Sequence, residues 1–299
     1  MDRRSFLKQG LTLTAGAMVA GSPAALLGAT PHPDLTALMG GTPEAMFDQG
    51  IAAMGGMGRF VRPNQTVVIK PNIGWDTPPE RAADTNPQLI KHMVKHSLDA
   101  GAKKVYVFDH TADAWKKRYE HSGIKQAVKD AGGTLVPGNS MRHYHKIQIP
   151  GAQVLHQTEA HELFLESDVF INVPVLKHHI ATKLTIGMKN LMGVVWDRGW
   201  WHRNDLHQCI ADFTAYRIPD LTVVDAFRVL RANGPMGVSN ADTIPMNAQI
   251  LATDPVAADT AATRMFGLDP TGINYIAKAQ ERGLGTMDLA RLNIRKIKL

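Results

Sequence analysis

Side chains that bind anions or transfer protons are concentrated in one segment of the chain, residues 171–207. An apolar run at 169–175 leads into them. In chain order they are Lys177, His178, His179, Lys183, Lys189, Asn190, His202 and His207, and the segment also contains the aromatic residues Trp196, Trp200 and Trp201. Burying so many polar groups without partners is costly, so a purely structural role does not account for them. Histidines exchange protons near neutral pH, and lysines that lie close together lower each other's pKa. The segment therefore predicts a binding or catalytic site.

Acid–base chemistry on a small anionic molecule is the first interpretation of this segment. Lysine and asparagine side chains would bind a carboxylate or phosphate, and a histidine would act as general acid or base. The residues predicted to be catalytic are Lys177, His179, Lys189 and His202. Those predicted to bind the substrate are Lys70, Asn72, Asp109, Asn190, Trp200, Asp225 and Gly234.

A divalent metal is the second interpretation, because imidazole and carboxylate ligands suit zinc, iron or nickel. Its predicted ligands are His178, His179 and His207. A third interpretation is a non-catalytic periplasmic binding or accessory protein for a redox or metal system. Such a protein would tolerate loss of every histidine in the segment, whereas an enzyme of either kind would not.

Alternating strand and helix patterns predict the scaffold that positions these residues. The predicted strands include 66–70, 104–108, 169–175 and 221–224. The amphipathic stretch 86–101 indicates a helix between the first two strands. This order predicts an α/β fold with a mostly parallel sheet flanked by helices, in a Rossmann-like three-layer arrangement. Lys70, Asp109 and Asp225 each fall where a strand ends, at the edge where open α/β sheets bind ligands.

The expected domain organisation is simple. Residues 30–62 are expected to form an N-terminal arm with one helix, and residues 63–299 a single α/β domain. Within that domain, apolar residues alternate on both sides of Pro150-Gly151. This pattern predicts a small β-hairpin insertion at about residues 139–158.

The first 29 residues are expected to be a twin-arginine signal peptide. They contain the string Arg3-Arg4-Ser5-Phe6-Leu7-Lys8 and a short run of small and apolar residues. Cleavage near Ala29 and export by the Tat translocase would place the protein in the periplasm or outside the cell. The apolar run is too short for a good membrane span, so no stable membrane anchor is expected.

Composition excludes several classes of function. The net charge is +6, and the 33 Lys and Arg are dispersed among 27 Asp and Glu, which disfavours nucleic-acid binding. Cys209 is the one cysteine, so the chain cannot form an internal disulfide or ligate an iron–sulfur cluster with cysteines. The loop after the strand at 221–224 contains Gly234-Pro235-Met236-Gly237 and lacks a nucleotide-binding glycine pattern.

An ordered set of strings resembles the domain of unknown function 362 family. The strings are V-V-I-K-P-N (67–72), I-N-V-P-V-L-K-H-H (171–179), T-x-G-M-K-N-L-M-G (185–193), V-V-D-A (223–226), G-P-M-G (234–237) and T-D-P-V-A-A-D (253–259). The resemblance runs from about residue 67 to the C-terminus. It implies a fold and a site without naming a reaction. Some members of that family carry a ferredoxin-like iron–sulfur module, which this chain lacks, so any redox role would need a separate redox protein.

The layout of the site is also similar to that of the lactate-racemase family. Members of that family use a lysine-tethered nickel pincer cofactor and histidines that donate and accept protons. In this chain His179 and Lys189 have comparable placement after a core strand. His202 or His207 would supply the next histidine. The Ser-Gly-Gly string of that family is replaced here by Ile186-Gly187-Met188, a departure that argues against cofactor tethering at Lys189.

Overall fold

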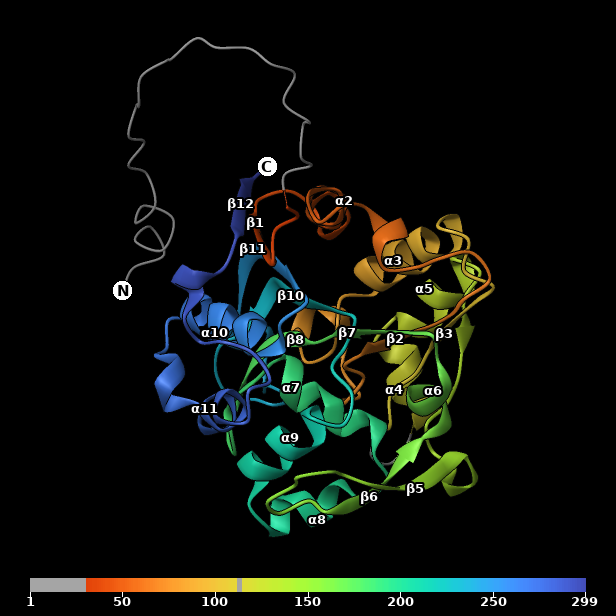
Figure 1. Ribbon diagram of the computed structural model, residues 1–299. Coiled ribbons are helices and arrows are strands. Elements are labelled where there is room, and N and C mark those ends of the chain that lie inside the picture. Colours follow the sequence, from red (N-terminus) through yellow and green to blue (C-terminus); the bar gives the residue numbers. More distant parts are fainter. Residues whose placement is uncertain (1–30, 112–114) are drawn as a thin grey trace, which may run out of the picture.

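The computed structural model describes residues 31–111 and 115–299, and a large, mostly parallel sheet lies at its centre (Figure 1). Its strands are β1 (Leu35–Met39), β2 (Thr66–Pro71), β3 (Lys104–Val107), β4 (Thr134–Leu135), β7 (Val169–Val173), β8 (Val175–His179), β9 (Lys183–Thr185), β10 (Leu221–Leu230), β11 (Thr243–Ala252) and β12 (Ile294–Lys298). The main order is β12-β1-β11-β10-β7-β2-β3-β4, and β8 and β9 extend the sheet beside β10. The predicted twin-arginine signal lies outside the described residues.

Helices cover both faces of the sheet, which confirms the predicted α/β fold class (Figure 1). They are α2 (Pro43–Ala53), α3 (Pro87–Asp99), α4 (Trp115–His121), α5 (Ile124–Asp130), α6 (Glu162–Glu166), α7 (Gly187–Asn190), α8 (Arg198–Arg203), α9 (Leu206–Thr214), α10 (Pro255–Phe266) and α11 (Asn274–Glu281). Within residues 31–111 and 115–299, no helix has both the length and the hydrophobicity to cross a membrane.

Side-chain alternation along the strands creates two separate apolar cores. On β2, Val67 and Ile69 belong to the core formed with α2, α3 and α5, whereas Val68 belongs to the core formed with α6, α9, α10 and α11. Successive side chains of a strand point to opposite faces, so a strand with apolar residues at every position is buried on both sides. This explains why the central strands are continuous apolar runs.

The helix predicted at 86–101 is confirmed as α3. Asn86 begins it, because its side chain accepts hydrogen bonds from the backbone N–H groups of Gln88 and Leu89. Its apolar face packs on the sheet through side chains that include Ile90 and Met93, both fully buried. The same periodicity leaves the opposite face of α3 to carry polar residues.

The strand expected over 169–175 is interrupted at Pro174. β7 ends at Val173, and β8 continues in the same direction along β10. The backbone N–H of Asp225 on β10 donates to the carbonyl oxygen of Pro174 at 2.9 Å, so the proline interrupts the strand without turning the chain away. Lys177, His178 and His179 therefore lie within a strand, although the predicted strand ended at residue 175.

The N-terminal arm contributes more than the one helix expected. Leu35–Met39 forms β1, which lies inside the sheet between β11 and β12. Its sequence, Leu-Thr-Ala-Leu-Met, has one β-branched residue and otherwise favours helix. β1 pairs with the outer edge of β11, and β12 in turn joins the sheet through β1. Local sequence does not reveal this tertiary pairing.

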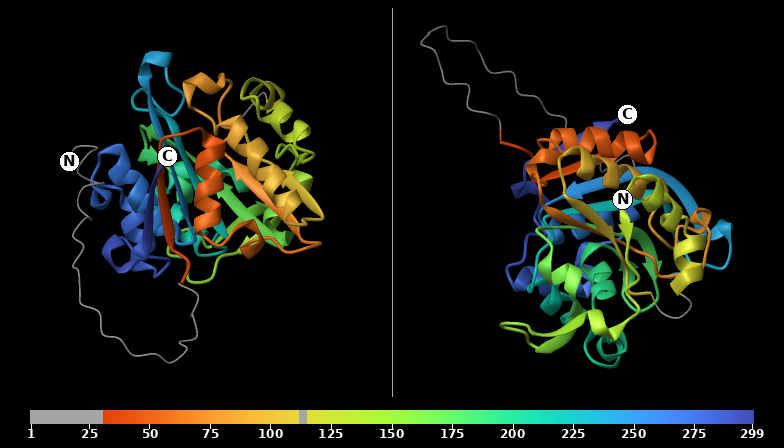
Figure 2. Two further views of the ribbon diagram at one scale, coloured as in Figure 1. Left: turned by 90° about the horizontal axis from the view of Figure 1, so that it is seen from above. Right: turned by 90° about the vertical axis from the view of Figure 1, so that its right-hand side faces the viewer.

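The predicted hairpin is present as β5 (Tyr144–Gln148) and β6 (Gln157–His161), an antiparallel pair separate from the main sheet and visible at the bottom of Figure 1. Asp212 of α9 attaches its loop to the body. One carboxylate oxygen accepts backbone hydrogen bonds from Gln153, Val154 and Leu155 at 3.1, 2.8 and 2.9 Å. The other pairs with Arg282 at 2.9 Å. In the right-hand view of Figure 2 the hairpin protrudes at the lower edge.

Replacing Asp212 with alanine is expected to lower the free energy of unfolding by about 3 kcal/mol, because three backbone N–H groups lose their acceptor and the Arg282 guanidinium loses its carboxylate partner. Chemical denaturation monitored by circular dichroism measures the change. Asp99→Ala is the control, since Asp99 is exposed, and its removal should cost less than about 0.5 kcal/mol. Equal unfolding midpoints for the two variants would contradict this role.

Candidate functional site

A cavity of about 340 Å³ opens at the carboxyl ends of β2, β3 and β8, beside α7 and α8. It gathers side chains from segments far apart in the sequence. The predicted site residues that line it are Lys70, Asn72, Asp109, Lys177, His179, Lys189, Asn190 and His202. The carboxyl edge of the sheet is thus where most of the predicted residues converge.

Lys70 is the centre of a buried polar network. Its side chain is fully buried, and its ammonium group pairs with Asp109 at 2.8 Å. It also donates to the carbonyl oxygen of Pro71 at 2.6 Å and to the amide oxygen of Asn190 at 3.1 Å. Asn190 in turn accepts a hydrogen bond from Asn72 at 2.9 Å. Burial lowers the pKa of Lys70, and the Asp109 carboxylate opposes that shift.

Lys177 is held just as firmly. It is 1% exposed, and its ammonium group donates to the side-chain oxygen of Asn72 at 2.9 Å and to the carbonyl oxygen of Ala83. Burial lowers the pKa of Lys177 and raises the pKa of the nearby Asp84 carboxyl, while the attraction between the two groups opposes both shifts. Lys177 and Asn72 therefore form a rigid wall of the cavity.

Lys189 differs from the other two lysines because it lacks a charged partner within the described part of the chain. Its ammonium group contacts the Met192 sulfur at 3.3 Å. Burial, followed by repulsion from Lys177 and Arg198, lowers the pKa of Lys189 to about 7. The helix that carries it, α7, is fixed by Asp259, which accepts the backbone N–H groups of Gly187 and Met188 at 2.7 and 3.0 Å.

Two histidines lie beside Lys189. Burial and then repulsion from Lys189 and Lys177 lower the pKa of His179 to about 2, so its ring is neutral at physiological pH. Its Nδ1 atom accepts the backbone N–H of Ala181 at 3.1 Å, which places the ring proton on Nε2. Burial also lowers the pKa of His202, the more exposed of the two. Both rings line the cavity in the neutral form.

Two arginines that were not predicted also line the cavity, Arg118 and Arg198. Arg118 lies over the ring of Trp75 at 5.6 Å and donates to the carbonyl oxygen of Gly74. The Arg198 guanidinium has neither a hydrogen-bond acceptor nor an ion-pair partner among the described residues, and burial lowers its pKa. Arg198 lies between Trp196 and Trp200 in the segment predicted to form the site, so its place in the sequence could have indicated that it belongs to the cavity.

Gly193 permits the close approach on which the Lys70 network depends. A Cβ atom at this position would overlap the Asp109 carboxylate and lie 2.6 Å from the Lys70 nitrogen. The carbonyl oxygen of Gly193 also accepts the backbone N–H of His110 at 2.8 Å. The string T-x-G-M-K-N-L-M-G therefore ends in a glycine because no side chain fits there.

The remaining predicted residues lie outside the cavity lining. Asp225 is buried and accepts the backbone N–H groups of Asn86 and Phe227 at 2.7 and 3.0 Å, so it joins β10 to the start of α3. Gly234 packs its backbone against His178, where a Cβ atom would overlap a carbonyl oxygen. Trp200 uses its backbone N–H to bond Asp197 at the start of α8. The cavity lining contains none of these three residues.

The three predicted metal ligands are not brought together. His178 and His179 are neighbours on β8, so their side chains point to opposite faces. His178 Nδ1 accepts the N–H of Gly234 at 3.0 Å, and the His207 ring stacks on Tyr275 at 6.1 Å. Over the described residues, the metal-ligating side chains that do converge are Asp48, His92 and His96, which could hold a metal ion.

Comparison with known proteins shows the family. The family described as Domain of unknown function (DUF362) matches residues 67–264. The chain belongs to this family. The match spans Lys70, the cavity lysines and Asp259, so the whole Lys70 network lies within the DUF362 region. The expected membership is thereby confirmed.

Two similar proteins give the DUF362 chain its context. It is 27% identical over 241 residues to "Thylakoid-associated protein sll1697" of Synechocystis, with 77% of this chain and 72% of that protein covered. The lactate racemase apoprotein of Thermoanaerobacterium thermosaccharolyticum superposes with a TM-score of 0.49 at 12% identity, over 78% of this chain. That match spans 56% of the racemase, and the racemase's activity does not transfer at this level of similarity.

Replacing Gly193 with alanine is expected to separate Lys70 from Asp109 and to lower the free energy of unfolding by about 3 kcal/mol, because a buried ion pair loses its geometry. Gly58→Ala is the matched control, since a Cβ atom there meets no atom within 4 Å. Urea denaturation of both variants tests the difference. A Gly193→Ala protein as stable as Gly58→Ala would show that the ion pair adapts without cost.

Proposed function

We propose that the DUF362 chain is an enzyme that binds a small carboxylate- or phosphate-bearing substrate in the cavity and transfers a proton through Lys189. The observation that carries the proposal is the state of Lys189 itself. It is 7% exposed, it lines the cavity, and its pKa is lowered to about 7. A group with a pKa near the working pH exchanges protons most effectively in catalysis.

The charge of the lining supports an anionic substrate. Its cationic side chains are Lys70, Lys177, Lys189, Arg118 and Arg198. Its one carboxylate, among the residues that the structure describes, is Asp109, which is already held by Lys70. Mutual repulsion between these cations destabilises the empty cavity, and an anion placed among them relieves it.

The roles divide according to how each group is held. Lys70, Lys177 and Asn72 are fixed by internal hydrogen bonds, so they provide a preorganised positive field. Within the described residues, the Lys189 ammonium group donates no hydrogen bond to an oxygen atom. It can therefore lose its proton and act as a general base. His179 presents its Nε2–H group as a donor to a substrate oxygen, and His202 lies at the more exposed side.

Metal assistance inside the cavity does not fit the donor set. A divalent cation there would face several lysines and arginines, while the Asp109 carboxylate and His179 Nδ1 are already engaged. The proposed proton transfer is therefore assigned to the side chains alone.

Replacing Lys189 with methionine is expected to lower the rate of proton exchange by at least about 100-fold, because the general base is lost. The measurement is loss of carbon-bound proton signals of small carboxylates, such as lactate and malate, in deuterated water by nuclear magnetic resonance. For the wild type, kcat/KM should rise as pH increases through about 7, where Lys189 loses its proton. Lys146→Met, on the exposed edge of the hairpin, is the control.

Calorimetric titration of the same carboxylates, and of inorganic phosphate, separates catalysis from binding. Binding without exchange, unchanged when His179 and His202 become alanine, would favour the non-catalytic binding or accessory protein. Absence of both binding and exchange across the panel would overturn the proposal for these substrates. Exchange that persists in Lys189→Met would exclude Lys189 as the base.

The proposed location is the periplasm or the exterior of the cell, and it rests on the Arg3-Arg4 string and its apolar continuation. The name of the thylakoid-associated relative is compatible with a protein that works at or beyond a membrane. The proposal that this protein works with a separate redox protein rests on the family resemblance alone.

Replacing Arg3 and Arg4 together with lysine is expected to block export, because the twin arginines are what the Tat translocase recognises. Cell fractionation and immunoblotting should show the wild type in the periplasm, shortened at about Ala29, and the variant retained at full length in the cytoplasm. Lys8→Arg is the control. Equal export of wild type and double variant would contradict a twin-arginine signal.

A further inference from the structure

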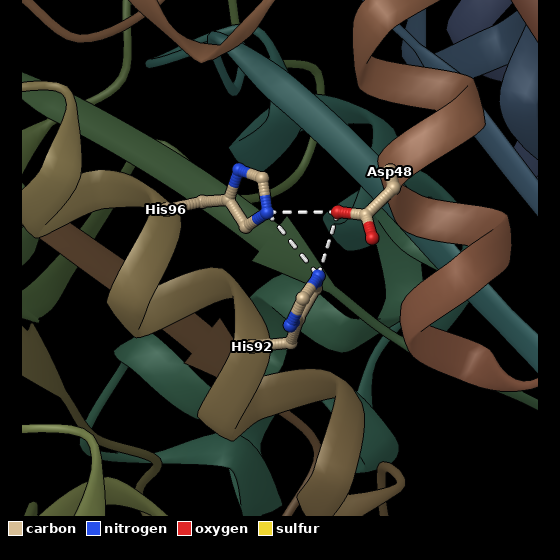
Figure 3. Close-up of side chains that lie close together, drawn as sticks. All are labelled: Asp48, His92 and His96. Atoms are coloured by element: carbon tan, nitrogen blue, oxygen red, sulfur yellow. Dashed lines mark hydrogen bonds and ion pairs between the residues drawn. The ribbon is translucent and has the colours of Figure 1, made fainter.

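A second cluster of titratable side chains lies on α2 and α3, helices that contribute nothing to the cavity lining. Asp48 projects from α2, and His92 and His96 project from α3 toward it (Figure 3). The two histidines are one helical turn apart, so they share a face of α3. The helices pack side by side, which brings the carboxylate to the two rings.

The three facing atoms form a closed triangle. Asp48 Oδ1 lies 2.7 Å from His92 Nε2 and 2.8 Å from His96 Nε2, and the two Nε2 atoms are 3.2 Å apart (Figure 3). The side chains are 46%, 24% and 30% exposed in the order Asp48, His92, His96, so an ion in solution can reach them.

Hydrogen bonds alone do not satisfy this triangle. With Asp48 ionised, its oxygen is only an acceptor, so both histidines must carry a proton on Nε2 to bond it. The contact between the two Nε2 atoms is then a contact between two donors. If either histidine gives up that proton, it faces the carboxylate with a lone pair. One cation in the middle would use the lone pairs of all three atoms at once.

The surroundings hold the rings in place from one side. Phe47 of α2 is fully buried and meets the His92 and His96 rings edge-on, at centroid distances of 6.1 and 5.4 Å. This packing leaves the Nε2 edges directed at Asp48. Around a tetrahedral zinc ion the ligand atoms would be about 3.3 Å apart, so small side-chain rotations would admit the ion.

We propose that Asp48, His92 and His96 form a binding site for one zinc ion. Two imidazole nitrogens and one carboxylate oxygen match the three protein ligands of an open zinc site, with water in the remaining position. Magnesium and calcium prefer sites made of oxygen ligands, so they suit this donor set poorly. The ion would bridge α2 to α3. The site is independent of the cavity and of the proton transfer proposed there.

The test is calorimetric titration of zinc chloride into the untagged, full chain after treatment with EDTA and desalting. One ion per chain is expected. His92→Ala, His96→Ala and Asp48→Ala should each weaken binding by at least about tenfold, since each removes a ligand. His156→Ala is the matched control, because this exposed histidine lies in the loop of the hairpin, and its affinity should equal that of the wild type.

Thermal unfolding gives a second readout, because an ion that binds only the folded protein raises its unfolding temperature. Zinc should raise the midpoint of the wild type and of His156→Ala, and leave the midpoint of the His92→Ala/His96→Ala double variant unchanged. His96→Gln keeps a polar side chain and serves if an alanine variant fails to fold. Absence of zinc binding by the wild type, or equal affinity in the double variant, would overturn the proposal.

Discussion

The buried ammonium group of Lys70 is the constraint on which the rest of the site depends. A charge removed from water is tolerated only where it is paired and hydrogen-bonded, and Lys70 has both the Asp109 carboxylate and the Asn190 amide oxygen. Lys70 lies on β2, Asp109 follows the end of β3, and Asn190 belongs to α7. Satisfying one buried charge therefore fixes the relative positions of β2, β3 and α7, and Gly193 has no side chain because that contact leaves no space.

This arrangement explains why Lys189 behaves differently from its neighbours. The one carboxylate among the described lining residues is already engaged by Lys70, so the same low-dielectric region offers Lys189 no counter-ion. Its pKa falls because burial and neighbouring cations both disfavour the charged form. The reactivity proposed for Lys189 thus depends on Lys70 holding the Asp109 carboxylate. A second carboxylate in the cavity would pair with Lys189 and raise its pKa again.

Much of this site follows from strand order, because parallel strands bring their carboxyl ends to one edge. Lys70 and Asp109 were predicted on that basis and line the cavity. The predictions failed where tertiary contacts decide. β1 forms from a helix-favouring sequence because it pairs with the edge of β11 and with β12. Arg198 lines the cavity as the first residue of α8. Asp225 instead accepts hydrogen bonds from the backbone N–H groups of Asn86 and Phe227.

The histidines show why proximity in sequence is a poor guide to proximity in space. His178 and His179 are adjacent, yet a strand directs adjacent side chains to opposite faces, so they bond different partners. His92 and His96 are separated by three residues, yet a helix places them on one face with their Nε2 atoms 3.2 Å apart. Their spacing within the predicted helix 86–101 was visible in the sequence. The sequence could not show that Asp48 lies beside these two histidines, because only the packing of α2 against α3 brings its carboxylate to their rings.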